Sequence, residues 1–155
     1  METSFLAEIH PKVVHFPVAL LTTYAFLEII GVVFKKEFIS NSALLILCLG
    51  VVTAFFAVLT GNQAFANFTF WTDESTALLD KHQTYATYLL WFSVILCALR
   101  IYFVIKKKFI SFTQYLFILF AIVILFLVYE TGTHGGNLVK KHGIGTDFFD
   151  TKISE

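Results

Sequence analysis

The sequence predicts an all-α integral membrane protein, a bundle of four helices that cross the bilayer, on three observations. Of the 155 residues, 57% are hydrophobic and only 14% are charged, whereas soluble domains carry about 25% charged residues. Four apolar stretches approach the roughly 20 residues that a helix needs to cross a bilayer. Lysines cluster in the two loops that join the first stretch to the second and the third to the fourth.

The apolar stretches set the predicted spans, at about residues 13–34, 43–61, 84–105 and 113–130. We expect a single membrane domain over residues 1–155, with residues 131–155 as an outer tail. The first span has a start signal at Pro11, because proline is favoured at the first position of a helix. The third has N-caps at Thr72 and Asp73 and is expected to start above the bilayer.

The two lysine-rich loops predict the orientation of the bundle. They contain Lys35 and Lys36, and Lys106 to Lys108, close to the ends of the spans. Short loops that face the cytoplasm carry an excess of lysine and arginine. We therefore expect these loops inside and both termini outside.

Several function classes are excluded or disfavoured. A net charge of zero without a basic stripe argues against a nucleic-acid partner. No Ser-His-Asp order, carboxylate pair or zinc-protease motif occurs, so a catalyst with its own substrate is the least expected function. Cys48 and Cys97 each lie in an apolar stretch, and no Cys-x-x-Cys-His motif is present to attach a haem covalently. A haem would be held by ligation alone.

All five histidines fall at the predicted outer face of the membrane. His10 and His15 stand at the outer end of the first span, His82 at that of the third, and His134 and His142 just past the fourth. A single interfacial histidine is usually structural. Five from three segments of the chain instead indicate a metal or cofactor site between helices.

Imidazole ligands alone suit haem iron, copper or zinc. An aromatic-rich, apolar pocket favours haem b, one or two groups. The alternative is a structural or assembly subunit of a membrane complex, with a copper or zinc histidine site or no cofactor. We predict His15 and His82 as the axial pair, because they lie inside different helices at similar depth. His10 and His15 are about 140° apart around a helix, so they are expected to have different roles.

The remaining histidines and two tail glycines complete the predicted site. His10, His134 and His142 would ligate a second haem, or would orient the ligands of a single one. Gly135 and Gly136 would let the tail approach the flat macrocycle closely. Away from this site, Glu28 and Arg100 lie inside predicted spans at comparable depth, which predicts an ion pair toward the inner face.

Two segments resemble a known family. They are His10 to Leu20, with the pattern HPxxVHFPxAL, and Gly135 to Gly145, with GGxLVxxHGxG. Together with Thr60-Gly61 and His82, they resemble a bacterial membrane family, the domain of unknown function numbered twenty-two thirty-one. Similar domains occur fused to periplasmic c-type cytochrome modules. The resemblance implies the bacterial inner membrane, electron transfer in or beside a respiratory assembly, and a periplasmic c-type cytochrome or another respiratory subunit as partner. A homo-oligomer is left open.

Overall fold

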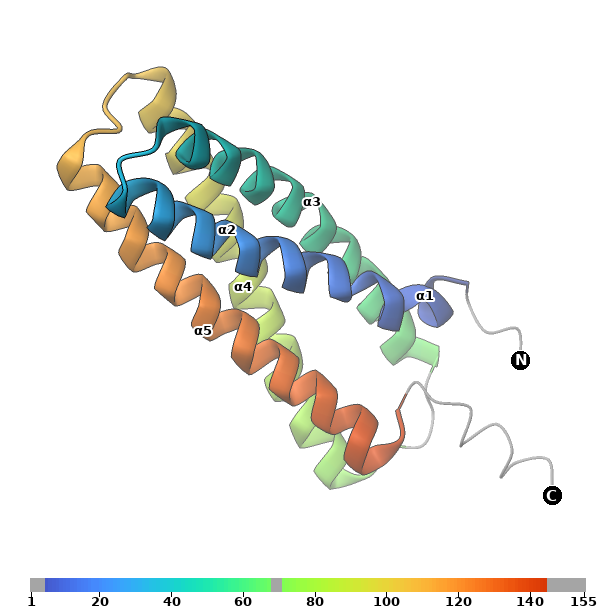
Figure 1. Ribbon diagram of the computed structural model, residues 1–155. Coiled ribbons are helices and arrows are strands. Elements are labelled where there is room, and N and C mark those ends of the chain that lie inside the picture. The colour runs from blue at the N-terminus through green and yellow to red at the C-terminus, as the bar shows by residue number, and fades with distance from the viewer. Residues whose placement is uncertain (1–4, 68–70, 145–155) are drawn as a thin grey trace.

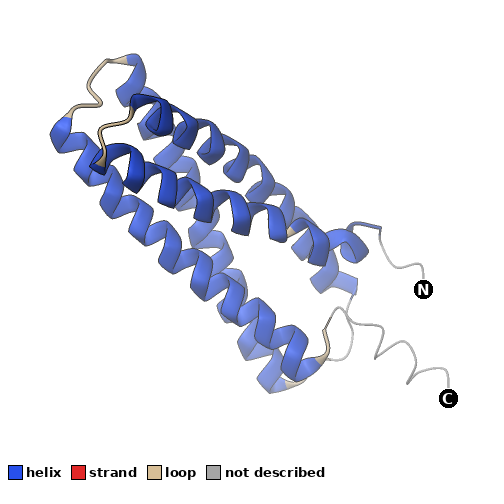
Figure 2. Cartoon of the chain, viewed as in Figure 1, coloured by secondary structure: helices blue, strands red, loops and turns tan. Residues whose placement is uncertain are grey.

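The computed structural model describes residues 5–67 and 71–144, and these residues form helices joined by short loops (Figures 1 and 2). The helices are α1 (Phe5–Val13), α2 (His15–Val33), α3 (Glu37–Asn67), α4 (Asp73–Ile105) and α5 (Ser111–His142). No strand occurs in this part of the chain. The predicted all-α class is confirmed.

The first of the four spans consists of α1 and α2 together, from Phe5 to Val33. Only Val14 separates the two helices, and its backbone is helical. Pro17 has no N–H for the carbonyl one turn earlier, so the hydrogen-bond ladder is interrupted at this junction. The span begins before Pro11, which lies inside α1. The expected start at Pro11 was wrong, and His10 consequently lies inside a helix.

The last span does not end at residue 130 as expected. Helix α5 continues through Gly132, Gly135 and Gly136 to His142, and Gly143 ends it with a φ of 64°. A glycine inside a helix costs about 1 kcal/mol relative to alanine, so glycine composition alone suggested a loop. Packing of α5 along α4 offsets this cost. The predicted outer tail is thus helical as far as His142, and residues 145–155 lie outside the described residues.

Helices α3 and α4 also extend past their predicted spans at the same end of the bundle. The structure describes residues on both sides of the connection between them, but residues 68–70 lie outside the described part. Thr72 caps α4 as predicted, since the Ser75 N–H donates to its Oγ1 at 3.2 Å. The extra turns extend these helices beyond their most apolar segments, at the end of the bundle where the histidines lie.

The four spans form an up-down-up-down bundle in which each packs against its neighbours in the chain and α5 returns to α2 (Figure 1). Buried faces meet in a core of large apolar side chains, among them Leu21, Leu47, Leu96, Phe117 and Ile124. The core therefore runs between all four spans.

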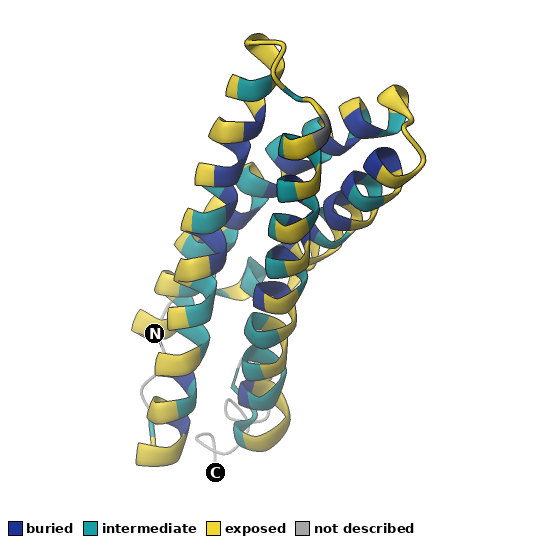
Figure 3. Cartoon of the chain, turned by 90° about the vertical axis from the view of Figure 1, so that its left-hand side faces the viewer, coloured by how far each residue is buried: buried dark blue, intermediate teal, exposed yellow. Residues whose placement is uncertain are grey.

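Large apolar side chains also cover the outside of the bundle, where exposed residues follow one side of each helix (Figure 3). Phe26, Phe55 and Phe126 are each more than half exposed. A helix that is apolar all around suits a membrane rather than water. All four spans are long and apolar enough to cross a bilayer. The predicted membrane bundle is confirmed.

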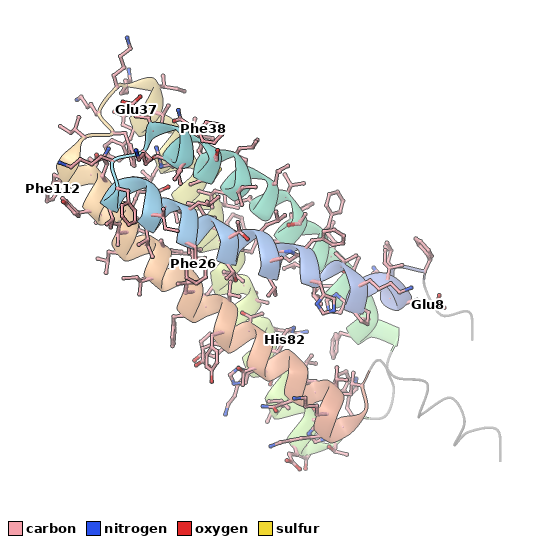
Figure 4. All side chains as sticks on the ribbon, in the orientation of Figure 1. Glu8, Phe26, Glu37, Phe38, His82 and Phe112 are labelled. Atoms are coloured by element: carbon pink, nitrogen blue, oxygen red, sulfur yellow. The ribbon has the colours of Figure 1, made fainter. Side chains whose placement is uncertain are left out.

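The two ends of the bundle differ in chemistry. The lysine end consists of the loops Phe34–Lys36 and Lys106–Ile110. The histidine end consists of α1, the first turns of α4 and the last turns of α5. In Figure 4, Glu37 and Phe112 mark the first end, and Glu8 lies at the second.

The predicted ion pair between Glu28 and Arg100 is confirmed near the lysine end. The Arg100 Nε lies 3.3 Å from Oε1 of Glu28 and donates to Oε2 at 3.4 Å. Its Nη2 donates to the Ser40 hydroxyl at 2.7 Å and to the Ser40 carbonyl at 3.2 Å. The guanidinium carbon is 3.3 Å from the ring centre of Phe109. One buried side chain from α4 thus connects α2, α3 and the loop before α5.

At the lysine end, α2 and α4 are each followed by a residue whose backbone is strained. Lys35 and Lys107 each have a φ of 52°, in the left-handed region. A side chain there costs about 1–2 kcal/mol, and glycine usually takes such a position. Helix α5, at the other end, follows the usual rule with Gly143.

Candidate functional site

The described structure gathers all five histidines at the histidine end, as the sequence predicted. His10 lies in α1, His15 begins α2, His82 lies in α4, and His134 and His142 lie in α5. Helix α1 packs on α3, and α4 packs on α5, but within the described chain α1 has no backbone contact with α4 or α5. His10 and His82 therefore belong to separate helix pairs, which diverge at this end (Figure 1).

His82 is held in place by α5. Its Nδ1 donates a hydrogen bond to the backbone carbonyl of Thr131 at 3.0 Å. A carbonyl oxygen can only accept, so in the neutral ring the proton sits on Nδ1 and the lone pair on Nε2. The ring also lies against Gly135, where an added Cβ would be 3.0 Å from Cε1. This contact fixes the ring close to the α5 backbone.

His10 is held by α3 in a similar manner. Its Nδ1 lies 3.0 Å from the Thr60 hydroxyl oxygen. That hydroxyl donates its one proton to the backbone carbonyl of Phe56 or Ala57, at 3.0 and 3.1 Å. In that arrangement it accepts from the Nδ1–H of His10, which leaves the Nε2 lone pair of the neutral ring for a ligand bond.

The His10 ring lies against a glycine as well. An added Cβ on Gly61 would be 2.9 Å from Cε1 of His10, closer than real contacts allow. Each of the two rings thus occupies space that an alanine on the neighbouring helix would fill. His10 and His82 therefore share two features, a hydrogen-bonded Nδ1 and a glycine in contact with the ring.

Three of the histidines, one each on α1, α4 and α5, lie close enough together to interact electrostatically. His10 and His82 are close enough for their protonated forms to repel each other, and the same holds for His82 and His134. The row therefore crosses from α1 through α4 to α5. In Figure 4, His82 lies on the side of α4 nearest α5 and the first span.

His134 completes the row from α5. Its Nδ1 donates to the Glu130 carbonyl at 2.7 Å, so the lone pair of its neutral ring is on Nε2 too. The Glu130 carboxylate is 3.7 Å from the same Nδ1 and would pair with a protonated ring. The ring stacks on Tyr85 of α4, with centres 5.2 Å apart and planes at 18°. His134 is thus fixed in orientation, although it had been predicted on a loose tail.

The geometry of the described residues favours His10 over His15 as the neighbour of His82, and the predicted pairing of His15 with His82 stays a prediction. His15 is exposed, whereas His10 is half-buried and close to His82. Positions five apart differ by about 140° around a helix, so only one of the two histidines can face the bundle interior. Because the helix begins at Phe5 rather than at Pro11, His10 is not at a frayed start and takes this place.

The last predicted site residues have separate positions. His142 lies in the final turn of α5, and its Nε2 is buried without a hydrogen-bond partner among the described residues. An added Cβ on Gly136 would meet nothing within 4 Å. Gly135 therefore lies against the His82 ring and Gly136 does not, and the predicted approach of the two glycines to a flat ligand stays a prediction.

The donor set favours one class of cofactor. Within the described residues, no three His, Cys, Asp or Glu side chains lie together in a way that could hold a metal ion. Copper and zinc sites built by protein side chains generally need three or four ligands. A haem brings four nitrogen ligands of its own and needs one or two axial imidazoles. Two histidines whose Nδ1 atoms are bonded within their own helix pairs match the one or two axial imidazoles that a haem needs.

Sequence reasoning missed the residues that orient the imidazoles. Thr60 and Gly61 stood out only as a Thr-Gly pair near the end of an apolar stretch. A second Thr-Gly pair, Thr131-Gly132, repeats this signal near the end of the fourth stretch. The oxygen that Thr131 supplies is a backbone atom, so no residue type could have indicated its role.

Comparison with known proteins places the chain in a family. The model of the family described as "Predicted membrane protein (DUF2231)" matches residues 7–148, so the chain belongs to this family. No curated protein and no solved structure matches the chain.

Proposed function

We propose that this member of the family is a b-type cytochrome-like electron carrier, which binds haem b between His10 and His82 at the histidine end. The observation that carries the proposal is the matched pair of rings on separate helix pairs, each with Nδ1 bonded to its neighbouring helix. A hydrogen bond from the outer nitrogen fixes the orientation of a ligating imidazole and makes it more basic. Nε2 is then the ligand atom in both histidines.

Two axial histidines imply electron transfer rather than catalysis. A haem b held by His10 and His82 would supply a reversible one-electron couple. The chain's own contribution would be to hold one imidazole on α1 and the other on α4, two helices without backbone contact in the described chain. The apolar bundle below this end would exclude water from the lower side of the site.

The arrangement supports one haem per chain. His134 and His142 are both on α5, about 12 Å apart along the helix, which is too far for one iron. His15 is exposed on another side. A second haem would need a ligand from another chain.

We assign the protein to the bacterial inner membrane, with the histidine end outside and a periplasmic c-type cytochrome or another respiratory subunit as its electron partner. The lysine loops support this orientation, because cytoplasmic loops are enriched in lysine. A haem at the outer end would be within reach of a periplasmic protein. The family resemblance to chains fused to c-type cytochrome modules supports the same partner.

The direct test is an absorption spectrum of the full chain, purified from cells supplied with haem precursor. We expect a Soret band, sharp reduced bands typical of two imidazole ligands, and about one haem per chain. Stoichiometric copper or zinc without a Soret band would overturn the proposal, as would a folded chain that takes up no haem on reconstitution.

Alanine at Gly61 or Gly135 is expected to reduce haem binding without unfolding the bundle. The new methyl group would force the His10 or His82 ring away from its position, because the closest ring atom lies 2.9 or 3.0 Å from the Cβ site. Haem titration monitored at the Soret band measures the loss, which we expect to be about 2- to 12-fold, from the roughly 0.5–1.5 kcal/mol that an off-rotamer side chain costs.

Gly132→Ala and Gly136→Ala are the matched controls for this prediction. Both glycines lie in the same helix as Gly135, but an added Cβ at either meets nothing within 4 Å. We expect unchanged haem affinity and a helix that is more stable by about 1 kcal/mol. Equal losses in all four variants would show that the glycines act through the helix and not through the imidazoles.

Cysteine labelling tests the orientation. In a chain with Cys48 and Cys97 replaced by alanine, a single cysteine at Asp73 should react with an impermeant reagent in intact cells, and one at Glu37 should not. Both positions are exposed in the structure. The reverse pattern would place the histidine end in the cytoplasm and remove the periplasmic partner, while the haem site itself would stand.

A further inference from the structure

The lysine end presents an unpaired cluster of positive charge. Its five lysines are all exposed: Lys35, Lys36, Lys106, Lys107 and Lys108. In the described part of the chain, none of them forms an ion pair, and Glu37 is the one acidic residue of the two loops and their flanking helix starts. Because these charges are not used inside the protein, they are available to an anionic ligand at the membrane surface.

Both loops hold a lysine at a position where the backbone favours glycine. Lys35 and Lys107 have the same φ of 52°. In each loop, the next lysine closes the helix: the N–H of Lys36 donates to the Gly31 carbonyl at 2.8 Å, and that of Lys108 to the Phe103 carbonyl at 2.9 Å. Two separate loops therefore share one geometry and one unfavourable residue choice.

A third helix end with a left-handed backbone, among the described residues, is occupied by glycine, which is the usual residue there. Gly143 follows α5 at the histidine end, with a φ of 64° and an N–H bonded to the Val139 carbonyl at 2.9 Å. The chain thus has glycine at this position at one end of the bundle and lysine at both such positions at the other. The positive-inside rule accounts for lysines anywhere in these loops, and Lys36, Lys106 and Lys108 would already satisfy it.

The two loops stand on one rigid base. Arg100 of α4 donates hydrogen bonds to Ser40, which lies in the first turn of α3 after the first loop. The same guanidinium lies against Phe109 in the second loop. Gly31, at the end of α2, is so close to Ser40 that an added Cβ would be 2.9 Å from its backbone nitrogen. The lysine backbones are therefore fixed relative to each other before any ligand binds.

We propose that the lysine end binds the headgroup of an anionic phospholipid, with Lys35 and Lys107 as its principal contacts. The ligand is a lipid and not a free anion, because the lysines follow directly on lipid-facing helix ends: Phe34 and Ile105 beside them are more than half exposed. A lipid can place its chains against these side chains and its phosphate among the lysines. The left-handed lysines are then retained for binding in spite of their local strain.

The test uses the purified full chain in a neutral detergent, titrated with phosphatidylglycerol or phosphatidylcholine, with bound lipid counted by native mass spectrometry. The wild type should retain phosphatidylglycerol preferentially. In the double variant Lys35→Gly/Lys107→Gly, the affinity for phosphatidylglycerol should fall about 25-fold, since each lysine at a membrane surface contributes about fivefold. The same variant should melt at a higher temperature, because glycine relieves the strain.

Opposite signs for lipid affinity and stability separate binding from misfolding. Lys35→Gln/Lys107→Gln should lose the same affinity without the gain in melting temperature. Lys140→Gln/Lys141→Gln, at the histidine end, should leave phosphatidylglycerol binding unchanged. Equal retention of the two lipids by the wild type, or unchanged phosphatidylglycerol affinity in the glycine variant, would overturn the proposal.

Discussion

Replacing Arg100 by leucine is expected to destabilise the bundle by about 3–5 kcal/mol. The guanidinium and the Glu28 carboxylate are 1% and 0% exposed, so the substitution leaves a carboxylate without its partner inside the bundle. It also removes the bonds to Ser40 and the contact with Phe109, which join α3 and the loop before α5 to α4. Unfolding in a denaturing detergent, followed by circular dichroism, measures the loss.

The double variant Glu28→Leu/Arg100→Leu is expected to be more stable than Arg100→Leu alone, because it removes both charges and strands neither. Lys106→Gln is the matched control: it also removes one positive charge near the same end, but from an exposed side chain, and should change stability by less than about 0.5 kcal/mol. Additive losses in the double-mutant cycle would mean that the two side chains do not act as a pair.

This ion pair could be predicted from the sequence because it depends only on how deep each charged residue lies along its span. A charge inside an apolar span needs an opposite charge at equal depth, and the depths of Glu28 and Arg100 follow from counting residues to the lysine loops. The four spans follow in the same way from the length and apolar character of each stretch. Ser40 and Phe109 could not be found by this route, because neither is unusual at its position in the sequence.

Helix ends were harder to predict than helix existence. Glycine content suggested that the last helix ends at residue 130, and Pro11 suggested where the first begins. In the structure, packing against a neighbour overrides both local signals: α5 continues along α4, and α1 continues along α3. Both errors fell at the histidine end, so they altered the part of the chain that carries the candidate site.

The end of the bundle at which the histidines lie was easier to predict than their arrangement there. Five histidines at one end followed from the topology, since an exact angle around each helix is not needed to assign an end. The choice between His10 and His15 depends on that angle, and therefore on where the helix starts and how the prolines bend it. The start at Phe5 places His10 inside a helix, where it faces Thr60 and Gly61 of α3.

Alanine at either His10 or His82 is expected to abolish the spectrum of haem with two imidazole ligands, in protein that remains folded. In this row His10 is the one imidazole of α1 and α3. His82 and His134 both belong to α4 and α5, but the His134 ring is stacked on Tyr85. Loss of one ligand should convert low-spin haem to high-spin haem or release it. Absorption spectra of the oxidised and reduced proteins, normalised to folded protein, measure the effect.

His15→Ala is the matched control, because this histidine lies on the same span five residues from His10 but is exposed. Its spectrum should equal that of the wild type. Thr60→Val should keep both ligands but remove the acceptor for the His10 Nδ1, and we expect a more oxidising haem potential, because a less basic imidazole stabilises ferric iron less. If His15→Ala lost the low-spin bands and His10→Ala kept them, the axial pair would be His15 and His82, and the packing of α1 against α3 would have to change when haem binds.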